Sequence, residues 1–306
     1  MGSFLSIGEC MIEMADLSDG RYARGVAGDT FNAAWYARHL FPADWSIAYG
    51  TRLGMDPASQ TVFDCIAKAG IDTHWISRDP VCSVGLYMIT LSQGEREFTY
   101  WRAQSAARQL AQDLTLLRAM MADHDVLYFS GITLAILPPA DRERFCDCLA
   151  QARRAGACIA YNTNVRPRLW RGQDDMRNGI MMGARVADIV VSSTDDEGML
   201  FPDQQTSDAL DRYRSAGADT VVITNGPDPI WCDHLGQRSR HDVVPAKDVI
   251  DTTAAGDSFA AALLAGLVQG RDPEQAIGDA SFVAGQVVQA HGALISVEPP
   301  DHNRKL

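Results

Sequence analysis

Short apolar runs alternate with segments of helical periodicity along most of the chain. Residues 126–130, 157–161 and 188–193 are nearly continuous apolar runs, a pattern typical of strands that are buried on both faces of a sheet. Between the first two, we expect a helix over residues 138–155, which begins at prolines and ends at Gly156. Strands that alternate with helices indicate a parallel sheet covered by helices on both faces.

The same pattern predicts further elements on either side. We expect strands over residues 5–11 and 220–224, and helices over residues 30–40, 59–69, 207–216, 255–269 and 273–291. No internal repeat and no linker rich in Pro, Gly or Ser divides the 306 residues. The chain is therefore predicted to be a single domain, 1–306, of the α/β class.

The first hundred residues also contain a different pattern. Residues 83–102 alternate between apolar and polar side chains around a Gln-Gly pair at 93–94, which is typical of a β-hairpin. Residues 14–25 are polar and irregular, and they are candidates for another strand at a sheet edge. We therefore expect a small antiparallel sheet from residues of about 12–28 and 83–104. It could act as a lid or as a dimerisation sheet, and the sequence leaves both open.

Composition and charge exclude several classes of protein. The chain has 27 Lys and Arg against 39 Asp and Glu, a net charge of −12, whereas binders of nucleic acid or acidic membranes usually have clustered positive charge. No run approaches the roughly 20 apolar residues that span a bilayer. The N-terminus lacks the basic region of a signal peptide. The seven cysteines form no C-x-x-C pair, so we expect free thiols, as in a cytoplasmic protein.

The most informative segment is Asp-Thr-Thr-Ala-Ala-Gly-Asp-Ser at residues 251–258, directly before an Ala-rich helix. The first N–H groups of a helix have no helical partner, and the dipole is positive there, so this segment suits a phosphoryl group. Asp257 would repel that phosphate unless it has another purpose, such as accepting a proton from an attacking hydroxyl. The alternative is that Asp257 merely complements the helix dipole, and these residues alone leave both open.

Residues 251–264 resemble, at every position, the C-terminal signature of the ribokinase-like (PfkB-type) sugar kinases. A second family element is found at residues 27–32, and the similarity extends in order from residues 7–9 to 291–293. The resemblance implies a ribokinase-like three-layer α/β/α sandwich with a small antiparallel β lid. It also implies ATP as the phosphoryl donor and Mg²⁺ as the ion that accompanies ATP.

Within this family, several segments resemble the 2-keto-3-deoxygluconate kinases. They are residues 7–13, 85–87, 100–102, 130–137, 164–170 and 249–257. A 2-keto acid has a carboxylate that neutral sugars lack, and Arg102 and Arg166 could hold it by charge-assisted hydrogen bonds. The alternative for either Arg is a surface position or a contact with an ATP phosphate.

The resemblance also assigns roles to individual residues. Catalysis would depend on Asp257 as the base and on the Ala254, Ala255 and Gly256 backbone as the phosphoryl cradle. Substrate contacts are expected from Gly28, Asp29, Asn32, Tyr87, Tyr100, Arg102, Arg166 and Asp257. Nucleotide contacts are expected from Asn164, Thr224, Gly226, Ala254 and Gly256. Glu197 occupies the family's metal-associated position.

The preferred hypothesis is a kinase that phosphorylates the C6 hydroxyl of 2-dehydro-3-deoxy-D-gluconate. The nearest alternative is a kinase of another sugar, namely 2-keto-3-deoxygalactonate, fructose or ribose. A second alternative is a sugar-acid sensor without catalysis, which the Gly256–Asp257 pair disfavours because a sensor has no use for a base beside a phosphate cradle. A homo-oligomer through the lid sheet and a monovalent cation near Asp251 and Thr253 are further expectations.

Overall fold

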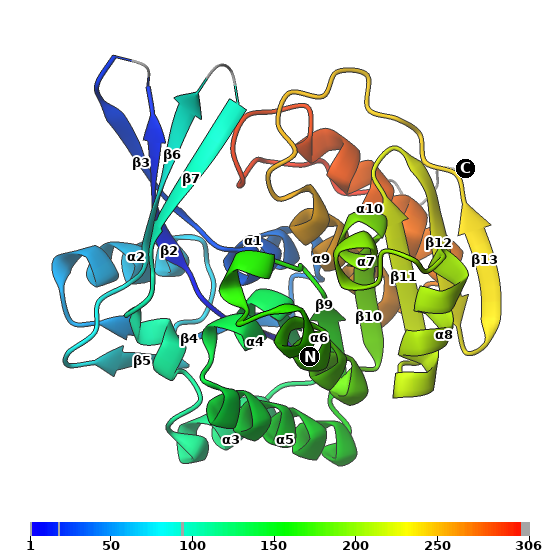
Figure 1. Cartoon of the computed structure of the whole chain (residues 1–306), viewed down its shortest axis with the longest axis horizontal. Helices are drawn as coiled ribbons and strands as arrows, with labels where there is room; N and C mark the ends of the chain where they lie inside the picture. The colour runs from blue at the N-terminus through cyan, green and yellow to red at the C-terminus, as the bar shows by residue number, and fades with distance from the viewer. Residues whose placement is uncertain (1, 18, 93–94, 301–306) are drawn as a thin grey trace.

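The large sheet at the centre of the protein is mostly parallel (Figure 1). The computed structural model describes residues 2–17, 19–92 and 95–300. Across the sheet, the described strands are β13 (Gln237–His241), β12 (Asp228–His234), β11 (Thr220–Asn225), β10 (Ile189–Ser193), β9 (Cys158–Asn162), β8 (Val126–Ser130), β1 (Ser3–Ile7), β4 (Ser46–Gly54) and β5 (Ile76–Asp79). The pairs β11–β12 and β12–β13 are antiparallel. The predicted parallel sheet is confirmed, with an antiparallel edge that the sequence did not predict.

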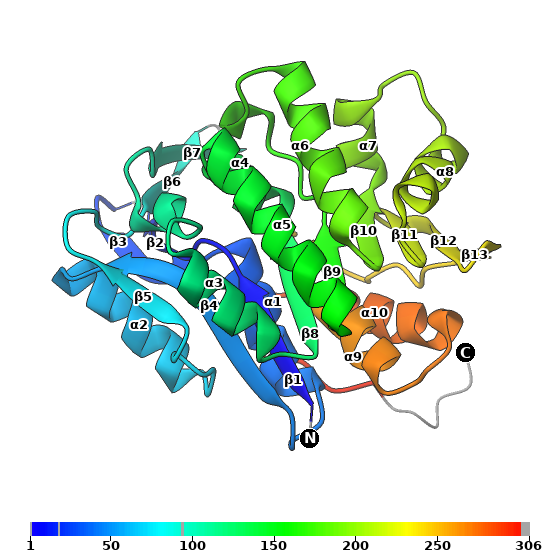
Figure 2. The same cartoon turned by 90° about the horizontal axis from the view of Figure 1, so that it is seen from below.

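Helices cover both faces of this sheet; in Figure 2, α5 and α6 lie on one side of the strands and α9 and α10 on the other. One face has α1 (Asp29–Leu40), α2 (Pro57–Lys68), α9 (Ala255–Val268) and α10 (Pro273–Val287). The other has α3 (Leu114–Ala122), α4 (Gly131–Ile136), α5 (Pro139–Ala155), α6 (Gln173–Val186), α7 (Thr194–Leu200) and α8 (Thr206–Ala216). Short 3-10 turns lie at Ala106–Gln109 and Pro167–Leu169. Helix α10 ends earlier than predicted.

The strand residues alternate between two hydrophobic cores. In β8, Val126 and Tyr128 belong to the core beneath α1 and α9, whereas Leu127 and Phe129 belong to the core beneath α5 and α6. Each fully buried Leu or Phe contributes roughly 2 kcal/mol of hydrophobic free energy. Because both faces of the central strands are buried, their sequences are continuously apolar, and this is why the pattern predicted them.

The second sheet, which we name the lid sheet after its predicted role, stands to one side of the large sheet (Figure 1). Its strands are, in order, β3 (Tyr22–Ala27), β2 (Met11–Asp16), β6 (Leu86–Ser92) and β7 (Glu95–Trp101). Strand β2 is antiparallel to β3 and parallel to β6, and β6 and β7 form the predicted antiparallel hairpin. The predicted turn residues Gln93 and Gly94 lie outside the described residues. The predicted fold class is confirmed.

The single strand predicted over residues 5–11 is wrong, because the chain leaves the large sheet after Ile7 and then enters the lid. The intervening Gly8 is tightly packed. A Cβ atom on Gly8 would lie 2.4 Å from Thr30 Oγ1 and 2.8 Å from Thr133 Oγ1. Only glycine fits at this exit without displacing its neighbours, and the turn there separates β1 from β2.

Among the described residues, no helix is both long enough and apolar enough to cross a membrane. All seven cysteines lie within the described part of the chain, and all are free thiols, as predicted. Burial raises the pKa of the Cys146 and Cys158 thiols to about 12. These two thiols therefore stay protonated at neutral pH and behave as small apolar core groups.

Candidate active site

The predicted site residues gather where the parallel strands of the large sheet end. Asn164 and Arg166 follow β9, Glu197 lies in α7 directly after β10, and Thr224 lies near the end of β11. Asp257 comes from the first turn of α9, which packs on the same sheet. Open α/β sheets bind ligands at the carboxyl ends of their strands, so this edge is the candidate site.

Asp257 is hydrogen-bonded to the predicted substrate segment. Its Oδ2 accepts a hydrogen bond from Asn32 Nδ2 at 2.8 Å, and Asp257 is only 9% exposed. Burial raises the pKa of Asp257 to about 7, and the negative charge of Asp29 adds to that rise. The Asn32 hydrogen bond and the positive charge of Arg166 act in the opposite direction. A carboxyl with a pKa near neutral pH is well suited to proton transfer.

The N-terminus of α9 is open, as the sequence predicts. Ala254 precedes the helix in the left-handed conformation, with φ 62°, and the Ala255 amide donates to Thr252 O at 3.2 Å. Within the described residues, no group accepts a hydrogen bond from the amides of Gly256 and Asp257. A Cβ atom on Gly256 would meet nothing within 4 Å, so the first turn of α9 is open at this residue. Unpaired amides at a helix N-terminus are suited to bind a phosphoryl group.

The substrate segment is shaped by close packing and by one amide contact. A Cβ atom on Gly28 would lie 2.3 Å from Glu9 O, so the loop before α1 requires glycine. Asp29 Oδ2 accepts a hydrogen bond from Asn164 Nδ2 at 2.7 Å. This contact puts Asn164 beside a predicted substrate residue, and its predicted contact with the nucleotide stays a prediction. Asn32 Oδ1 is buried and has no partner among the described residues, so it can accept a hydrogen bond from a substrate hydroxyl.

The loop that carries Arg166 is held by Asp196. The Asp196 carboxylate accepts hydrogen bonds from Thr163 Oγ1 at 2.6 Å and from Val165 N at 3.1 Å. Arg166 itself is exposed, and its charge lowers the pKa of Asp257. From the sequence, Asp196 could not be distinguished from a solvated residue at a helix start, because Thr163 and Val165 follow a different strand.

The predicted lid residues lie together on the β6–β7 hairpin. Tyr87 and Tyr100 are opposite one another, with ring centroids 5.7 Å apart, and the Tyr87 hydroxyl donates a hydrogen bond to Glu13. Burial and the negative charge of Glu13 raise the pKa of Tyr87, so its hydroxyl stays protonated. The Arg102 guanidinium lies 5.8 Å from the Tyr100 ring centroid and is paired with Glu9. The charge of Arg102 is therefore balanced by Glu9, and its predicted contact with the substrate carboxylate stays a prediction.

The other predicted nucleotide residues lie at the end of β11. Thr224 Oγ1 donates a hydrogen bond to Ser192 O at 3.2 Å. Gly226 follows at the exposed turn into β12, with φ 54° in the left-handed region that favours glycine. Their position at the strand ends is compatible with a nucleotide contact, which stays a prediction.

Both carboxylate oxygens of Glu197, the predicted metal-associated residue, have protein partners. Its Oε1 accepts hydrogen bonds from Ser192 Oγ and Tyr213 OH, both at 2.7 Å, and its Oε2 is paired with Arg212. No group of three or more His, Cys, Asp or Glu side chains in the described residues could hold a metal ion. Glu197 is a buried link between β10 and α8, and its association with a metal stays a prediction.

Asp251 anchors the loop that precedes α9. Its Oδ1 accepts hydrogen bonds from Thr253 N at 3.0 Å and Thr253 Oγ1 at 2.7 Å, and its Oδ2 accepts one from Gly292 N at 3.0 Å. The loop before α9 is thereby fixed to the segment after α10. This connection holds the backbone that leads to the Gly256 amide.

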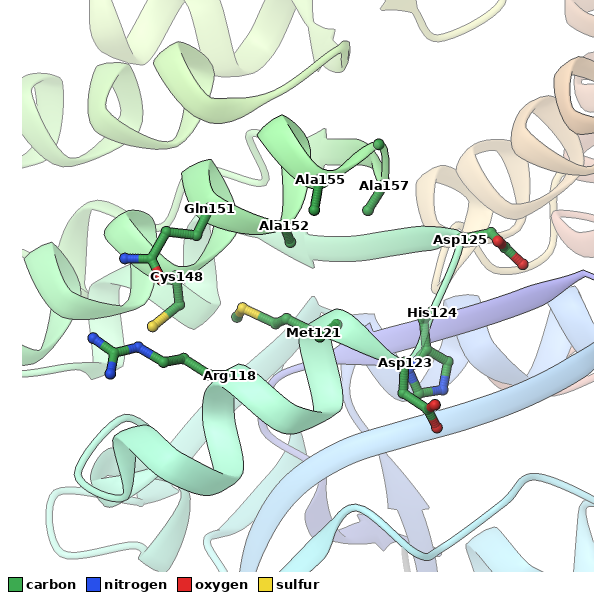
Figure 3. A pocket seen from close by; sticks show the side chains of 12 residues that line it. Arg118, Met121, Asp123, His124, Asp125, Cys148, Gln151, Ala152, Ala155 and Ala157 are labelled. Atoms are coloured by element: carbon green, nitrogen blue, oxygen red, sulfur yellow. The ribbon is translucent and has the colours of Figure 1, made fainter.

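A cavity of about 480 Å³ lies at the opposite edge of the sheet, between α3 and α5 (Figure 3). Figure 3 shows Arg118 of α3 facing Cys148 of α5, with His124 farther along, just before β8. None of the predicted site residues lines this cavity. The parallel strands begin at this edge, so the cavity is separate from the candidate active site.

Comparison with known proteins identifies the family. A model of the pfkB family carbohydrate kinases matches residues 1–300. The protein belongs to the pfkB family of carbohydrate kinases. Its 2-dehydro-3-deoxygluconokinase relative from Escherichia coli (strain K12) is 37% identical over 300 residues, covering 95% of this chain and 96% of the relative. The relative of that name from Haemophilus influenzae is 35% identical over 295 residues, covering 94% of each chain.

Solved structures of pfkB-type kinases share this fold. A fructokinase from Xylella fastidiosa with bound ATP has a TM-score of 0.82 at 22% identity, covering 95% of this chain and 94% of that one. A 2-dehydro-3-deoxygluconokinase from Thermotoga maritima has a TM-score of 0.82 at 19% identity, covering 97% of each chain. A ribokinase II structure from E. coli with ATP and Mg²⁺ has a TM-score of 0.82 at 18% identity, covering 96% and 95%.

Proposed function

We propose that the protein phosphorylates 2-dehydro-3-deoxy-D-gluconate on its C6 hydroxyl with ATP, which gives 2-dehydro-3-deoxy-6-phospho-D-gluconate. The observation that carries this proposal is Asp257, a buried carboxyl with a pKa of about 7 beside the unpaired amides at the start of α9. Family membership supports kinase chemistry. The relatives at 35% and 37% identity support the choice of substrate.

The chain's own groups divide the chemistry between them. Ionised Asp257 takes the proton of the attacking C6 hydroxyl, a role that accelerates the reaction by roughly 10²- to 10⁴-fold. The amides of Gly256 and Asp257 donate hydrogen bonds to the transferred phosphoryl group as its charge develops. Mg²⁺ bound with ATP supplies further neutralisation of phosphate charge. The lid closes over the bound sugar and excludes water that would otherwise consume ATP.

The substrate carboxylate is bound by the two arginines at the site. Arg166 is exposed at the strand ends, and the Arg102 Nε is buried and has no partner among the described residues. Arginine has five N–H donors, so Arg102 can contact both Glu9 and a carboxylate. The unpartnered Asn32 Oδ1 is placed to accept a hydrogen bond from a substrate hydroxyl.

A second candidate is a kinase of a neutral sugar such as fructose or ribose. The Arg102–Glu9 ion pair favours this candidate, because Glu9 balances the charge of Arg102. Among the described contacts, Arg166 is then the one arginine at the site that has no ion pair with a carboxylate. Substitution R166A distinguishes the two candidates. It should impair use of the keto acid far more than use of a neutral sugar.

ADP release tests the proposed function. Purified protein with Mg·ATP is supplied in turn with 2-dehydro-3-deoxygluconate, 2-dehydro-3-deoxygalactonate, fructose, ribose and gluconate. We expect turnover on the 2-keto-3-deoxy acids and background release on the others. Turnover on fructose or ribose alone would establish the neutral-sugar kinase. Binding of the keto acid without turnover on any compound would establish the sensor.

Three further assignments belong to this proposal. The free cysteines and the use of ATP favour a cytoplasmic protein.

The lid sheet, with Phe98, Tyr100 and Trp101 exposed, favours a homo-oligomer that pairs through it. A monovalent cation near Asp251 and Thr253 would act through the loop before α9. Its test is a comparison of turnover in potassium, sodium and tetramethylammonium salts.

A further inference from the structure

Glu9 lies at the junction between the large sheet and the lid. One residue separates it from the end of β1 and one from the start of β2, so it belongs to neither sheet. Its side chain is nevertheless almost fully buried, with 2% of the residue exposed. A carboxylate is rarely buried to this extent unless it is paired, so its partners indicate its purpose.

Both carboxylate oxygens of Glu9 are held by the end of the lid hairpin. Oε2 is paired with the Arg102 guanidinium, directly after β7, and Oε1 accepts a hydrogen bond from the Ser105 hydroxyl. Arg102 and Ser105 are also nearly fully buried. The carboxylate therefore connects the exit of β1 to the chain that leaves the lid.

Two glycines allow Glu9 to lie this close to the other substrate segments. A Cβ atom on Gly85, just before β6, would lie 2.9 Å from Glu9 Oε1. A Cβ atom on Gly28, in the predicted substrate loop, would lie 2.3 Å from Glu9 O. Glu9 thus contacts both ends of the lid hairpin and the loop before α1.

The ion pair fixes Arg102 through one end of its guanidinium group. The Glu9 contact uses Nη2, while Nε is buried and has no partner among the described residues. The stability of a buried ion pair depends on both partners, because removal of one leaves the charge of the other uncompensated. Without Glu9, Arg102 would reorient toward another acceptor or toward water, and its remaining donors would leave the site.

We propose that Glu9 is a positioning residue, which orients Arg102 toward the carboxylate of an acid substrate and couples that orientation to the lid. The proposal rests on the proposed function for its substrate. It assigns to Glu9 no contact with the reacting atoms. Glu9 acts through Arg102, and its loss should affect binding of the acid rather than binding of ATP.

Substitution E9Q tests this role, because glutamine keeps the shape but removes the charge. We expect the KM for 2-dehydro-3-deoxygluconate to rise by about 10- to 100-fold, while the KM for Mg·ATP changes by less than about 3-fold. E143Q, at an exposed position on α5, is the matched control and should change neither constant. An unchanged KM for the acid in E9Q would overturn the proposal, as would an equal rise in both constants.

A double-mutant cycle with R102A separates positioning from a general structural effect. If Glu9 acts through Arg102, E9Q in the R102A background should add less than about 2-fold to the KM for the acid. Fully additive effects would contradict the proposal. Should E9Q fail to fold, S105A removes the other contact to the same carboxylate and should raise the KM for the acid in the same direction. An S105A variant with wild-type constants would then count against the proposal.

Turnover of the acid by the wild-type enzyme tests the proposed function separately from the role of Glu9. Turnover of the acid by wild type, with E9Q unchanged, would overturn the positioning role alone. Absence of wild-type turnover on the acid would overturn the proposed function, and with it the substrate on which the Glu9 proposal rests.

Discussion

At the residue scale, the chemistry depends on a carboxyl that is buried beside a second carboxyl. Asp257 and Asp29 both lie in the first turns of helices, where the dipole favours negative charge, yet burial and mutual repulsion raise the pKa of Asp257 to about 7. Asn32 and Arg166 limit that rise. The balance keeps a base available near neutral pH without making it fully ionised.

Replacement of Asp257 tests its role as base. D257N should lower kcat by roughly 10²- to 10⁴-fold, because the amide cannot accept the hydroxyl proton. The dissociation constant for ATP should stay within about 3-fold of wild type, since the Gly256 amide is intact. Steady-state ADP release and calorimetric titration measure the two effects. D195N, at an exposed position in α7, is the control, and a D257N enzyme with wild-type turnover would contradict the base assignment.

The same substitution should stabilise the protein at high pH. The pKa of Asp257 is raised in the folded state. The contribution of Asp257 to the free energy of unfolding is therefore fully present below about pH 3.8 and is lost as the pH rises through about 7. D257N should therefore increase the free energy of unfolding at pH 8, by up to roughly 4 kcal/mol. The gain should shrink toward pH 4. Thermal denaturation of both proteins across this range measures it, and a gain independent of pH would be incompatible with the raised pKa.

The pH dependence of catalysis should follow the same group. For the free enzyme, kcat/KM should fall below about pH 7, where Asp257 becomes protonated. N32A removes a hydrogen bond that lowers this pKa, so the inflection should move to higher pH. A pH–rate profile of each enzyme measures the shift. An inflection that stays in place in N32A would show that another group controls the profile.

At the element scale, the strands that could be predicted are those that are buried on both faces. Strands β8 to β11 are buried between two helical layers, and their continuous apolar sequences predicted them. Strand β13 was not predicted, because it is the exposed antiparallel edge and its residues are polar. Its pairing depends on β12 rather than on its own sequence.

In the candidate site, too, features formed by neighbours in sequence could be predicted, and contacts between distant parts of the chain could not. The segment at 251–258 was predictable because its small residues, its aspartate and its helix are neighbours in sequence. The roles of Glu9 and Asp196 were not, because the partners of each are distant in the chain. The partners of Glu197 could not be predicted for the same reason, since Arg212 and Tyr213 reach it from the next helix.

The substrate loop before α1 provides a test at this scale. In G28A, the added Cβ would lie 2.3 Å from Glu9 O, so the loop must shift away from the lid junction. We expect kcat/KM for the sugar to fall by about 10-fold or more, as misplacement of a substrate segment commonly does. G198A is the control, because nothing lies within 4 Å of its added Cβ in α7. Equal kinetics in the two variants would contradict the role given to Gly28.

At the scale of the whole molecule, we expect the lid sheet to connect catalysis with assembly. On one of its faces, Tyr87 packs with Met11 and Ala27. Its outer strands β3 and β7 leave edges that no described strand covers. Unpaired edges with exposed aromatic side chains are common sites of association. A partner at this sheet would hold the hairpin that positions Arg102.

Association through the lid should be sensitive to Trp101, which is 55% exposed on β7. We expect wild-type protein at micromolar concentration to have the mass of a dimer or larger oligomer, and W101E to have a smaller mass by light scattering. W231E is the control, since Trp231 is 37% exposed on β12 at the other end of the molecule. A monomeric wild type, or a W101E variant of unchanged mass, would contradict assembly through the lid.

In the proposed reaction, the enzyme transfers the γ-phosphoryl group of ATP to the C6 hydroxyl of a 2-keto-3-deoxy acid. Phosphorus NMR of the product formed from Mg·ATP and 2-dehydro-3-deoxygluconate identifies the phosphorylated hydroxyl. We predict a new phosphomonoester signal that is split by two protons, because C6 carries two hydrogens. A signal split by one proton would place the phosphate on a secondary hydroxyl, and the absence of any new phosphomonoester would contradict the kinase assignment for this substrate.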